Sequence, residues 1–174
     1  MNRSTLAKAI RDSSKLSGHF VLRSGKVSDT YFDKYLFESD PAILREIAEQ
    51  MSALVPEVVD LLCGLEMGGI PVVTMLSQVT GLPCAFLRKD RKSHGTMKYA
   101  EGPDLQGRRI LLVEDVVSSG GAIIDGVAML RDDGIAPDRA LCVIDRQTGG
   151  HEALHEVGVS LEALFTMKEI EGDA

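Results

Sequence analysis

The clearest structural signal in the chain lies at residues 110–122, which read Ile110-Leu-Leu-Val-Glu114-Asp115-Val-Val-Ser118-Ser119-Gly120-Gly121-Ala122. Four apolar residues lead to two adjacent carboxylates, and a short turn of hydroxyls and glycines follows. From Ile123 to Leu130 apolar residues recur at helical spacing. This order predicts a buried strand, a tight loop and the N-terminus of a helix.

The predicted loop has the chemistry of a phosphate site. The first N–H groups of a helix lack internal partners and carry partial positive charge, and glycines let an anion approach them. Glu114 and Asp115 would repel a phosphate, but they can accept hydrogen bonds from sugar hydroxyls or face a metal through water. The loop therefore suits a ribose 5-phosphate. An ordinary turn with a serine N-cap would explain the hydroxyls but not the paired carboxylates.

This combination resembles the binding motif of the type I phosphoribosyltransferases, whose common donor is phosphoribosyl pyrophosphate (PRPP). It differs from the Walker phosphate loop, because neither Lys-Ser nor Lys-Thr follows its glycines. The resemblance concerns the donor and leaves the acceptor open.

The composition is that of one ordinary globular domain. The chain has 174 residues, with 44% hydrophobic and 26% charged, and its net charge of −7 argues against general nucleic-acid binding. Its longest apolar runs are too short to span a membrane, and its N-terminus lacks a signal-peptide core. Three cysteines without paired spacing read as core residues in a reducing cytoplasm. We therefore expect a cytoplasmic protein without a membrane partner.

Apolar runs and helical patterns alternate along the chain, which predicts an α/β fold with a central, mainly parallel sheet flanked by helices. We expect helices at 1–17, 40–54, 71–80, 121–133 and 150–157. The expected core strands are 58–63, 83–87, the run from 110, 140–144 and 159–165. A hairpin is expected over 20–37, and a short acidic tail from Thr166.

The predicted hairpin gathers four of the chain's eight Phe and Tyr residues between positions 31 and 37. Tyr35 and Phe37 read equally well as a small local core. Tyr31 and Phe32 are better candidates for stacking on a planar base. Because neighbouring strand residues point to opposite faces, we expect at most one of these two to face a given pocket.

Two further polar segments follow predicted strands. Residues 88–98 hold five of the nineteen Lys and Arg residues, within a long loop without apolar periodicity. A solvated basic loop is the simpler reading, but beside anion loops it predicts a clamp for pyrophosphate that closes over the site. Arg146 follows the strand at 140–144, where its planar fork could meet a carboxylate or could pair with Asp145.

A competing motif occurs at residues 151–155, His-Glu-Ala-Leu-His, which matches the zinc-protease pattern. Both histidines would share one helical face. However, Leu161 stands where the extended pattern has a third histidine, and Ala153, Leu154 and Val157 read as the buried side of a sheet-flanking helix. We therefore do not expect a zinc site.

Taken over residues 18–150, the chain resembles the orotate phosphoribosyltransferase family. The matching segments are Ser24-Gly25-Lys26 with Tyr31-Phe32, Gly68-Gly69-Ile70-Pro71, Arg88-Lys89 with Lys92-Ser93-His94-Gly95, Glu114–Ala122 and Asp145-Arg146-Gln147. The resemblance implies one type I phosphoribosyltransferase domain over 1–174. Within it we expect a small N-terminal hood at about 1–38, a core at about 39–174 and a mobile catalytic loop at about 89–105. It also implies a homodimer that shares the basic loop across subunits.

The resemblance further implies transfer of ribose 5-phosphate from PRPP to orotate in UMP biosynthesis, with Mg²⁺ held through PRPP and water rather than by a dedicated site. Catalytic roles are implied for Lys89, Lys92, His94 and Asp115. The implied PRPP contacts are Met67, Gly68, Arg88, Lys89, Lys92, His94, Glu114, Asp115, Val116, Val117, Ser118, Ser119, Gly120, Gly121 and Ala122. The implied orotate contacts are Ser118, Arg146, Tyr31, Phe32, Arg23 and Lys26.

Two alternatives share the PRPP motif. One is a phosphoribosyltransferase for another nucleobase, against which the acid-binding Arg146 argues. The other is a non-catalytic PRPP sensor that regulates transcription, which would need a DNA-binding segment, and residues 1–17 fit no basic helix-turn-helix.

Overall fold

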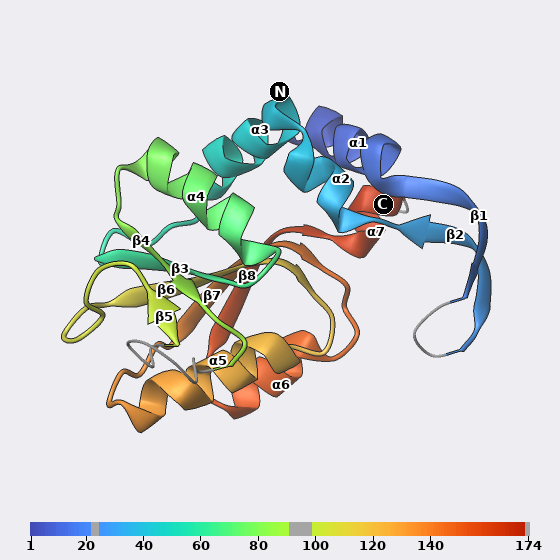
Figure 1. Ribbon diagram of the computed structural model, residues 1–174. Helices are drawn as coiled ribbons and strands as arrows, with labels where there is room; N and C mark the ends of the chain where they lie inside the picture. The colour runs from blue at the N-terminus through green and yellow to red at the C-terminus, as the bar shows by residue number, and fades with distance from the viewer. Residues whose placement is uncertain (22–24, 91–98, 173–174) are drawn as a thin grey trace.

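A six-stranded sheet forms the centre of the computed structural model, which describes residues 1–21, 25–90 and 99–172 (Figure 1). Its strand order is β5-β4-β3-β6-β7-β8, and all neighbours are parallel except the edge pair β4 and β5. The bounds of these strands are β3 Leu61–Leu65, β4 Cys84–Leu87, β5 Ala100–Glu101, β6 Ile110–Val117, β7 Arg139–Asp145 and β8 Ser160–Thr166. The α/β fold expected from the alternation is confirmed.

Helices cover both faces of the sheet (Figure 1). One face carries α1 Arg3–Ser14, α2 Lys34–Ser39, α3 Pro41–Ser52, α4 Gly69–Thr80 and α7 Met167–Glu171, and the other carries α5 Gly121–Asp132 and α6 Gly150–Glu156. Alternate residues of β6 serve the two cores, since Leu111 and Val113 face the α3 and α4 side while Leu112 faces α5. Burial on both faces explains why the central strands read as continuous apolar runs.

The order in which the strands are added to the sheet reverses between β3 and β6. These strands are hydrogen-bonded neighbours, but β3 leads through α4 to β4 on one side and β6 leads through α5 to β7 on the other. Ligands of open parallel sheets gather outside the carboxyl ends of the strands at such a switch point. The loops after β3 and β6 both open there.

The N-terminal region differs from its prediction. The first helix ends at Ser14, and Lys15–Val21 forms β1, which pairs antiparallel with β2, Val27–Phe32. Gly18 therefore does not stop a helix but lies in an irregularity of β1, where the register shifts between Ser17 and Phe20. The predicted hairpin is present, but its strands begin at Lys15 rather than residue 20 and end at Phe32 rather than residue 37.

Residues 34–37, which the aromatic pattern placed in a strand, belong to helix α2. Asp33 caps this helix by accepting a hydrogen bond from the Tyr35 amide at 3.1 Å. Phe37 is completely buried in the core between the helices and the sheet, whereas Tyr35 is exposed. The strand prediction failed because the aromatic pattern there reflects one buried helical side chain, not alternation.

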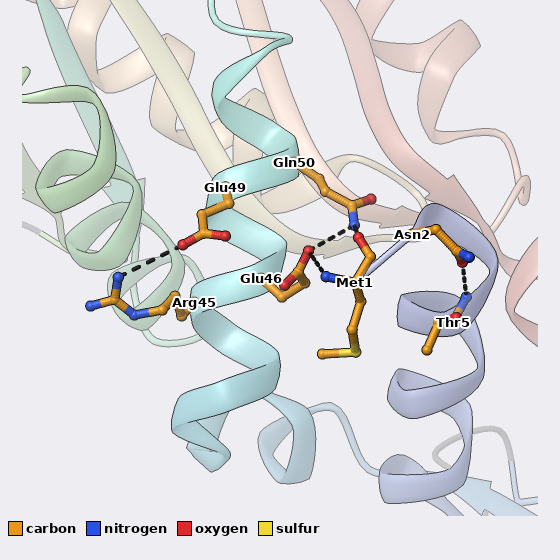
Figure 2. A network of polar contacts seen from close by, with 7 residues as sticks. All are labelled: Met1, Asn2, Thr5, Arg45, Glu46, Glu49 and Gln50. Carbon is orange, nitrogen blue, oxygen red and sulfur yellow. Dashed lines mark hydrogen bonds and ion pairs between the residues drawn. The ribbon is translucent and has the colours of Figure 1, made fainter.

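The first residues are held against α3 by a polar network (Figure 2). The N-terminal ammonium group of Met1 lies 2.5 Å from Oε1 of Glu46, and Gln50 donates to the Met1 carbonyl at 3.1 Å. Asn2 caps α1 through the Thr5 amide at 2.8 Å. Arg45 and Glu49 form a further exposed pair at 3.7 Å.

Other differences from prediction concern the ends of elements. The third strand begins at Leu61 rather than 58, a short strand β5 interrupts the loop expected over 90–107, and the acidic tail forms α7 with a Thr166 and Glu169 capping box. Helix α3 is confirmed in detail, with Asp40 as its N-cap and Pro41 at its first position. Within the described residues, no helix has the length and apolar character needed to cross a membrane.

Candidate active site

Three hollows meet around the turn that joins β6 to α5. The first, about 450 Å³, lies toward the N-terminal hairpin and includes Ser118 and Arg146. The second, about 170 Å³, is lined by Glu114 and residues 116–123. The third, about 410 Å³, lies between the turn and the loops after β3 and β4. We call them the base pocket, the turn pocket and the basic pocket, and residues 118–122 line parts of all three.

The turn leaves the first amides of α5 open to a ligand. Gly120 is the N-cap residue, has a left-handed φ of 77° and supplies no side-chain cap. The expected alternative, a serine that caps the helix, is therefore wrong, and Ser118 and Ser119 keep their hydroxyls for other partners. A side chain at position 120 would be strained and would meet the Gly150 carbonyl at 3.2 Å.

The two adjacent carboxylates of β6 lie in different surroundings. Glu114 lines the turn pocket, although only 7% of its surface is exposed. Asp115 is completely buried, and its Oδ2 lies 2.6 Å from Nζ of Lys34 on α2. Its Oδ1 accepts the Val116 amide at 2.6 Å. The sequence assigned both acids to one sugar, whereas only Glu114 borders the hollow.

Proton affinities in this cluster are shifted in opposite directions. Burial and the neighbouring Asp115 carboxylate raise the pKa of Glu114 well above its ordinary value. Burial alone would raise the pKa of Asp115, but hydrogen bonds from Glu38, Glu114 and Lys34 outweigh it and lower the pKa. Asp115 is therefore the member of this pair that ionises more readily.

The base pocket joins the N-terminal hairpin to the ends of β6 and β7. Its lining residues are Ser28, Thr30, Tyr31, Phe32, Asp33, Lys34, Tyr35, Val116, Ser118, Arg146 and Glu171. Tyr31 and Phe32 both contribute, so the expectation that at most one would do so is wrong, because β2 ends here and both side chains border the opening. Tyr31 remains 45% exposed and stacks loosely on Phe20, while Phe32 packs toward Phe37.

Arg146 projects from the turn after β7 with its side chain exposed. Its amide donates to the Val117 carbonyl at 2.9 Å, which holds the turn against the end of β6. Asp145 is buried and accepts the Gln147 amide at 2.8 Å. Among the described ion pairs none joins Arg146 to Asp145, so the alternative of a paired surface arginine is wrong.

The basic pocket brings together Arg88, Lys89 and the loop after β3. The Lys89 amide donates to Oε1 of Glu66 at 2.6 Å, and Arg88 lies 3.9 Å from Glu101. Met67 is 62% exposed, and Gly68 packs so closely on Asp115 that a Cβ there would meet Oδ2 at 1.9 Å. The Gly68 contact explains why the loop needs glycine at that position.

The remaining predicted site residues either lie outside the described residues or do not border the three pockets. Arg23, Lys92 and His94 lie outside the described residues. Lys26 is exposed near the start of β2 and does not border the base pocket. His151 and His155 are both exposed on α6, whose Leu154 faces the core, and the described residues contain no group of three potential metal ligands.

Sequence reasoning missed two residues of the cluster, Lys34 and Glu38. Residues 34–37 were interpreted as part of a strand. Only a helix would place Lys34 and Glu38 on one face, so the sequence did not indicate that these two side chains act together. The Asp33 cap was the available signal, since it starts a helix on which positions 34 and 38 share a face.

A strand-to-helix turn with paired acids, shared by three pockets at the switch point of a parallel sheet, defines a phosphoribosyltransferase. Residues 37–170 match the phosphoribosyl transferase domain family. The orotate phosphoribosyltransferase of Nocardioides sp. is 46% identical over 167 residues, which cover 96% of this chain and 93% of that protein. The chain belongs to the orotate phosphoribosyltransferase family.

Solved structures agree with this membership. Orotate phosphoribosyltransferase from Mycobacterium tuberculosis, in complex with Fe(III) dicitrate, has a TM-score of 0.88 at 28% identity and covers 98% of this chain and 99% of its own. The same enzyme in complex with PRPP has a TM-score of 0.83 at 25% identity, with coverage of 98% and 99%.

Proposed function

We propose that this chain transfers ribose 5-phosphate from PRPP to orotate, giving orotidine 5′-monophosphate and pyrophosphate. The observation that carries the proposal is the sharing of one turn by three hollows. A base, a sugar phosphate and a pyrophosphate must be adjacent during this reaction. The three pockets offer one adjoining place for each.

The turn pocket would take the 5-phosphate and the ribose. Amides at the start of α5, with the Ser118 and Ser119 hydroxyls, would donate to phosphate oxygens. Glu114 would face the sugar hydroxyls, and Asp115 behind it would supply the fixed negative charge of the cluster. Val116, Val117, Gly120, Gly121 and Ala122 shape this pocket through their backbone.

The base pocket would take orotate. Arg146 is a free planar fork that suits a carboxylate, and Ser118 would reach the base from the turn. Tyr31 and Phe32 would cover the ring. Two acids also border this pocket: Asp33, which accepts the Tyr35 amide, and Glu171, which is exposed at the end of α7.

The basic pocket would take the pyrophosphate, with Arg88 and Lys89 among its lining residues. The backbone of Met67 and Gly68, in the neighbouring loop after β3, is a further proposed contact. Lys92 and His94 are proposed to complete the pocket. Magnesium supplies charge compensation for the pyrophosphate when bound. The described carboxylates that line this pocket are Glu66 and Asp125. The proposed metal would be held mainly by PRPP oxygens and water.

The proposed reaction is displacement at the anomeric carbon of the ribose. The bond from this carbon to pyrophosphate breaks as the bond to the orotate nitrogen forms, and the proton on that nitrogen passes to water or to the leaving pyrophosphate. Negative charge grows on the leaving group, where Arg88 and Lys89 offset it, and Lys92 or His94 would supply its proton. Positive character on the sugar is stabilised by the acids beside it. Positioning and electrostatics therefore provide most of the catalysis.

We further propose a cytoplasmic homodimer in which the basic loop reaches the neighbouring site. The three cysteines are free, which fits a reducing compartment. Light scattering of the purified protein tests the dimer directly. A mass of one chain at assay concentration would contradict it.

The activity is tested by following orotate absorbance with PRPP and magnesium. Uracil, adenine and hypoxanthine serve as competing acceptors in parallel assays. We expect consumption of orotate and strong preference for it over the neutral bases. Turnover of another base in its place, or of none, would contradict the proposed function.

A further inference from the structure

Helix α2 turns two charged side chains toward the end of the central strand. Lys34 and Glu38 are one helical turn apart, so they share a face. Nζ of Lys34 lies 2.6 Å from Oδ2 of Asp115, and Glu38 is 95% buried by its relative exposure of 5%. A buried cluster therefore links α2 to β6 directly beneath the pockets.

Glu38 contributes a proton rather than a charge to this cluster. Neither of its oxygens receives a hydrogen bond from a described donor, and the Asp115 carboxyl is a neighbour close enough to shift its pKa. Two neighbouring carboxyls disfavour each other's ionisation, so one of them tends to keep its proton. Burial, followed by the contact with Asp115, raises the pKa of Glu38 to about 9. Asp115 is then the single ionised acid opposite Lys34.

Both oxygens of the Asp115 carboxylate are in contact with protein groups in this arrangement. Val116 donates to Oδ1, Lys34 contacts Oδ2, and Gly68 packs against the same oxygen. Its side chain has no exposed area, whereas that of Lys34 is 34% exposed. The group of this pair that meets the outside is therefore the ammonium, not the carboxylate.

Lys34 opens onto the base pocket, which it lines together with Ser118 and Arg146. An ammonium group has three donors, so one can stay on Asp115 while another reaches a ligand. Its charge is also retained, because the hydrogen bond and charge of Asp115 raise the pKa of Lys34 although burial opposes the shift. The pocket thus presents two cationic donors, from α2 and from the turn after β7.

We infer that Lys34 is a further substrate-contacting residue, held by Asp115 and Glu38 so that its ammonium donates to an oxygen of the anionic base. The inference rests on the proposed function, which places orotate in the base pocket. Asp115 and Glu38 are positioning residues in this arrangement, because they act through Lys34.

Two ligands separate a contact with the base from a contact with the sugar. Orotidine 5′-monophosphate would fill the base and turn pockets, and ribose 5-phosphate would fill the turn pocket alone. Titration calorimetry gives the affinity of the purified protein for each. For Lys34→Met we expect about a ten- to hundredfold loss of affinity for orotidine 5′-monophosphate, as for one charge-assisted hydrogen bond. The affinity for ribose 5-phosphate should change less than about threefold, within the usual scatter of such comparisons.

Companion variants keep the result decisive. Lys34→Arg retains a cationic donor and should recover most of the affinity for the nucleotide, and Lys8→Met on the exposed face of α1 is the matched control. If Lys34→Met unfolds because Asp115 is left without a counter-ion, Lys34→Gln keeps a neutral hydrogen-bond donor beside Asp115 and removes only the positive charge, and the same selective loss is expected from it.

Each outcome has a defined meaning. Equal losses for both ligands would show that Lys34 serves the sugar, and unchanged affinity for both would show that it serves neither, so either result overturns the inference. Wild-type protein that binds neither ligand would instead overturn the proposed function. Wild-type binding with a selective loss in Lys34→Met supports both.

Discussion

The carboxylates beneath the pockets and those on the surface near the N-terminus are held in opposite ways. Glu38 and Glu114 are buried around the Asp115 carboxylate, and burial raises the pKa of both. The pKa of Glu38 rises to about 9, so this carboxyl keeps its proton at neutral pH. Glu46 is paired with the N-terminal ammonium group and Gln50, and these contacts lower its pKa (Figure 2). The buried cluster has raised carboxyl pKa values and lies beside the pockets. The Glu46 contacts attach the N-terminus to α3.

A similar contrast separates two exposed arginines. Arg109 forms a two-point contact with Asp60, at 2.9 and 2.7 Å, which lowers the pKa of that carboxyl. Arg146 is also exposed, but its neighbour Asp145 is turned away into its own loop. A pair that is complete on the surface has a structural role, whereas a fork left open at a pocket is available for a ligand.

The largest expected effect comes from removing the central charge of the buried cluster. Asp115→Asn leaves the Lys34 ammonium without its counter-ion. We expect a loss of about 2–3 kcal/mol in unfolding free energy, below the ~3–5 kcal/mol of a fully buried pair because Lys34 is partly exposed. Urea unfolding at pH 7 measures it. Asp60→Asn is the surface counterpart and should lose much less, and equal losses would remove the distinction between the two regions.

The next effect separates the two arginines. Arg146→Ala should raise the KM for orotate by about tenfold or more, the cost of one charge-assisted contact, with a smaller change in the KM for PRPP. Steady-state kinetics with each substrate varied in turn measures both. Arg109→Ala should leave both constants close to those of the wild type. An unchanged KM for orotate in Arg146→Ala would remove the arginine from the base pocket.

A smaller effect concerns pH. Folded Glu38 holds a proton up to about pH 9, whereas the unfolded side chain loses it near its ordinary pKa of 4.5. The folded state therefore binds more protons between these values, and this residue lowers stability as pH rises through that window. Glu38→Gln should make this decline of the unfolding free energy with pH shallower. Urea unfolding from pH 5 to 9 measures the slope.

Glu46→Gln supplies the control of opposite sign. The lowered pKa of Glu46 means that its contribution to stability is present above the unfolded pKa and is lost as pH falls through the folded value. Its variant should therefore match the slope of the wild type from pH 6 to 9. Glu38→Gln with a slope like that of Glu46→Gln would contradict a protonated Glu38.

The smallest effect is that of salt. Raising NaCl from about 0.1 to 1 M shortens the screening length from about 10 to 3 Å and weakens exposed pairs more than buried ones. The destabilisation caused by Asp60→Asn should shrink at high salt, and that caused by Asp115→Asn should persist. Equal salt sensitivity of the two variants would place both pairs in the same environment.

The sequence predicted what periodicity and turn chemistry encode. The central strands, the helix capped by Asp40 and the β6 turn followed from apolar runs, a cap and glycines, and Ser118, Arg146 and Lys89 were found because polar residues after parallel strands meet at one edge. The helix at 34–39 did not follow, because six residues are too few for a periodic signal and its aromatic residues imitate a strand. Lys34 and Glu38 were lost with it.

Burial of individual side chains was equally beyond the sequence. Glu114 and Asp115 are adjacent and chemically alike, yet one borders a pocket and the other is enclosed by Lys34, Glu38 and Gly68. These neighbours come from α2 and from the loop after β3, which are distant in sequence. Only the assembled fold shows which acid remains near a ligand.

The most direct test is a crystal structure of this protein with orotidine 5′-monophosphate. We predict the phosphate against the amides at the start of α5, the ribose beside Glu114, and the base between Arg146 and the Lys34 ammonium. A nucleotide bound away from residues 118–122, or a base turned out of the pocket that Lys34 and Arg146 share, would contradict the account.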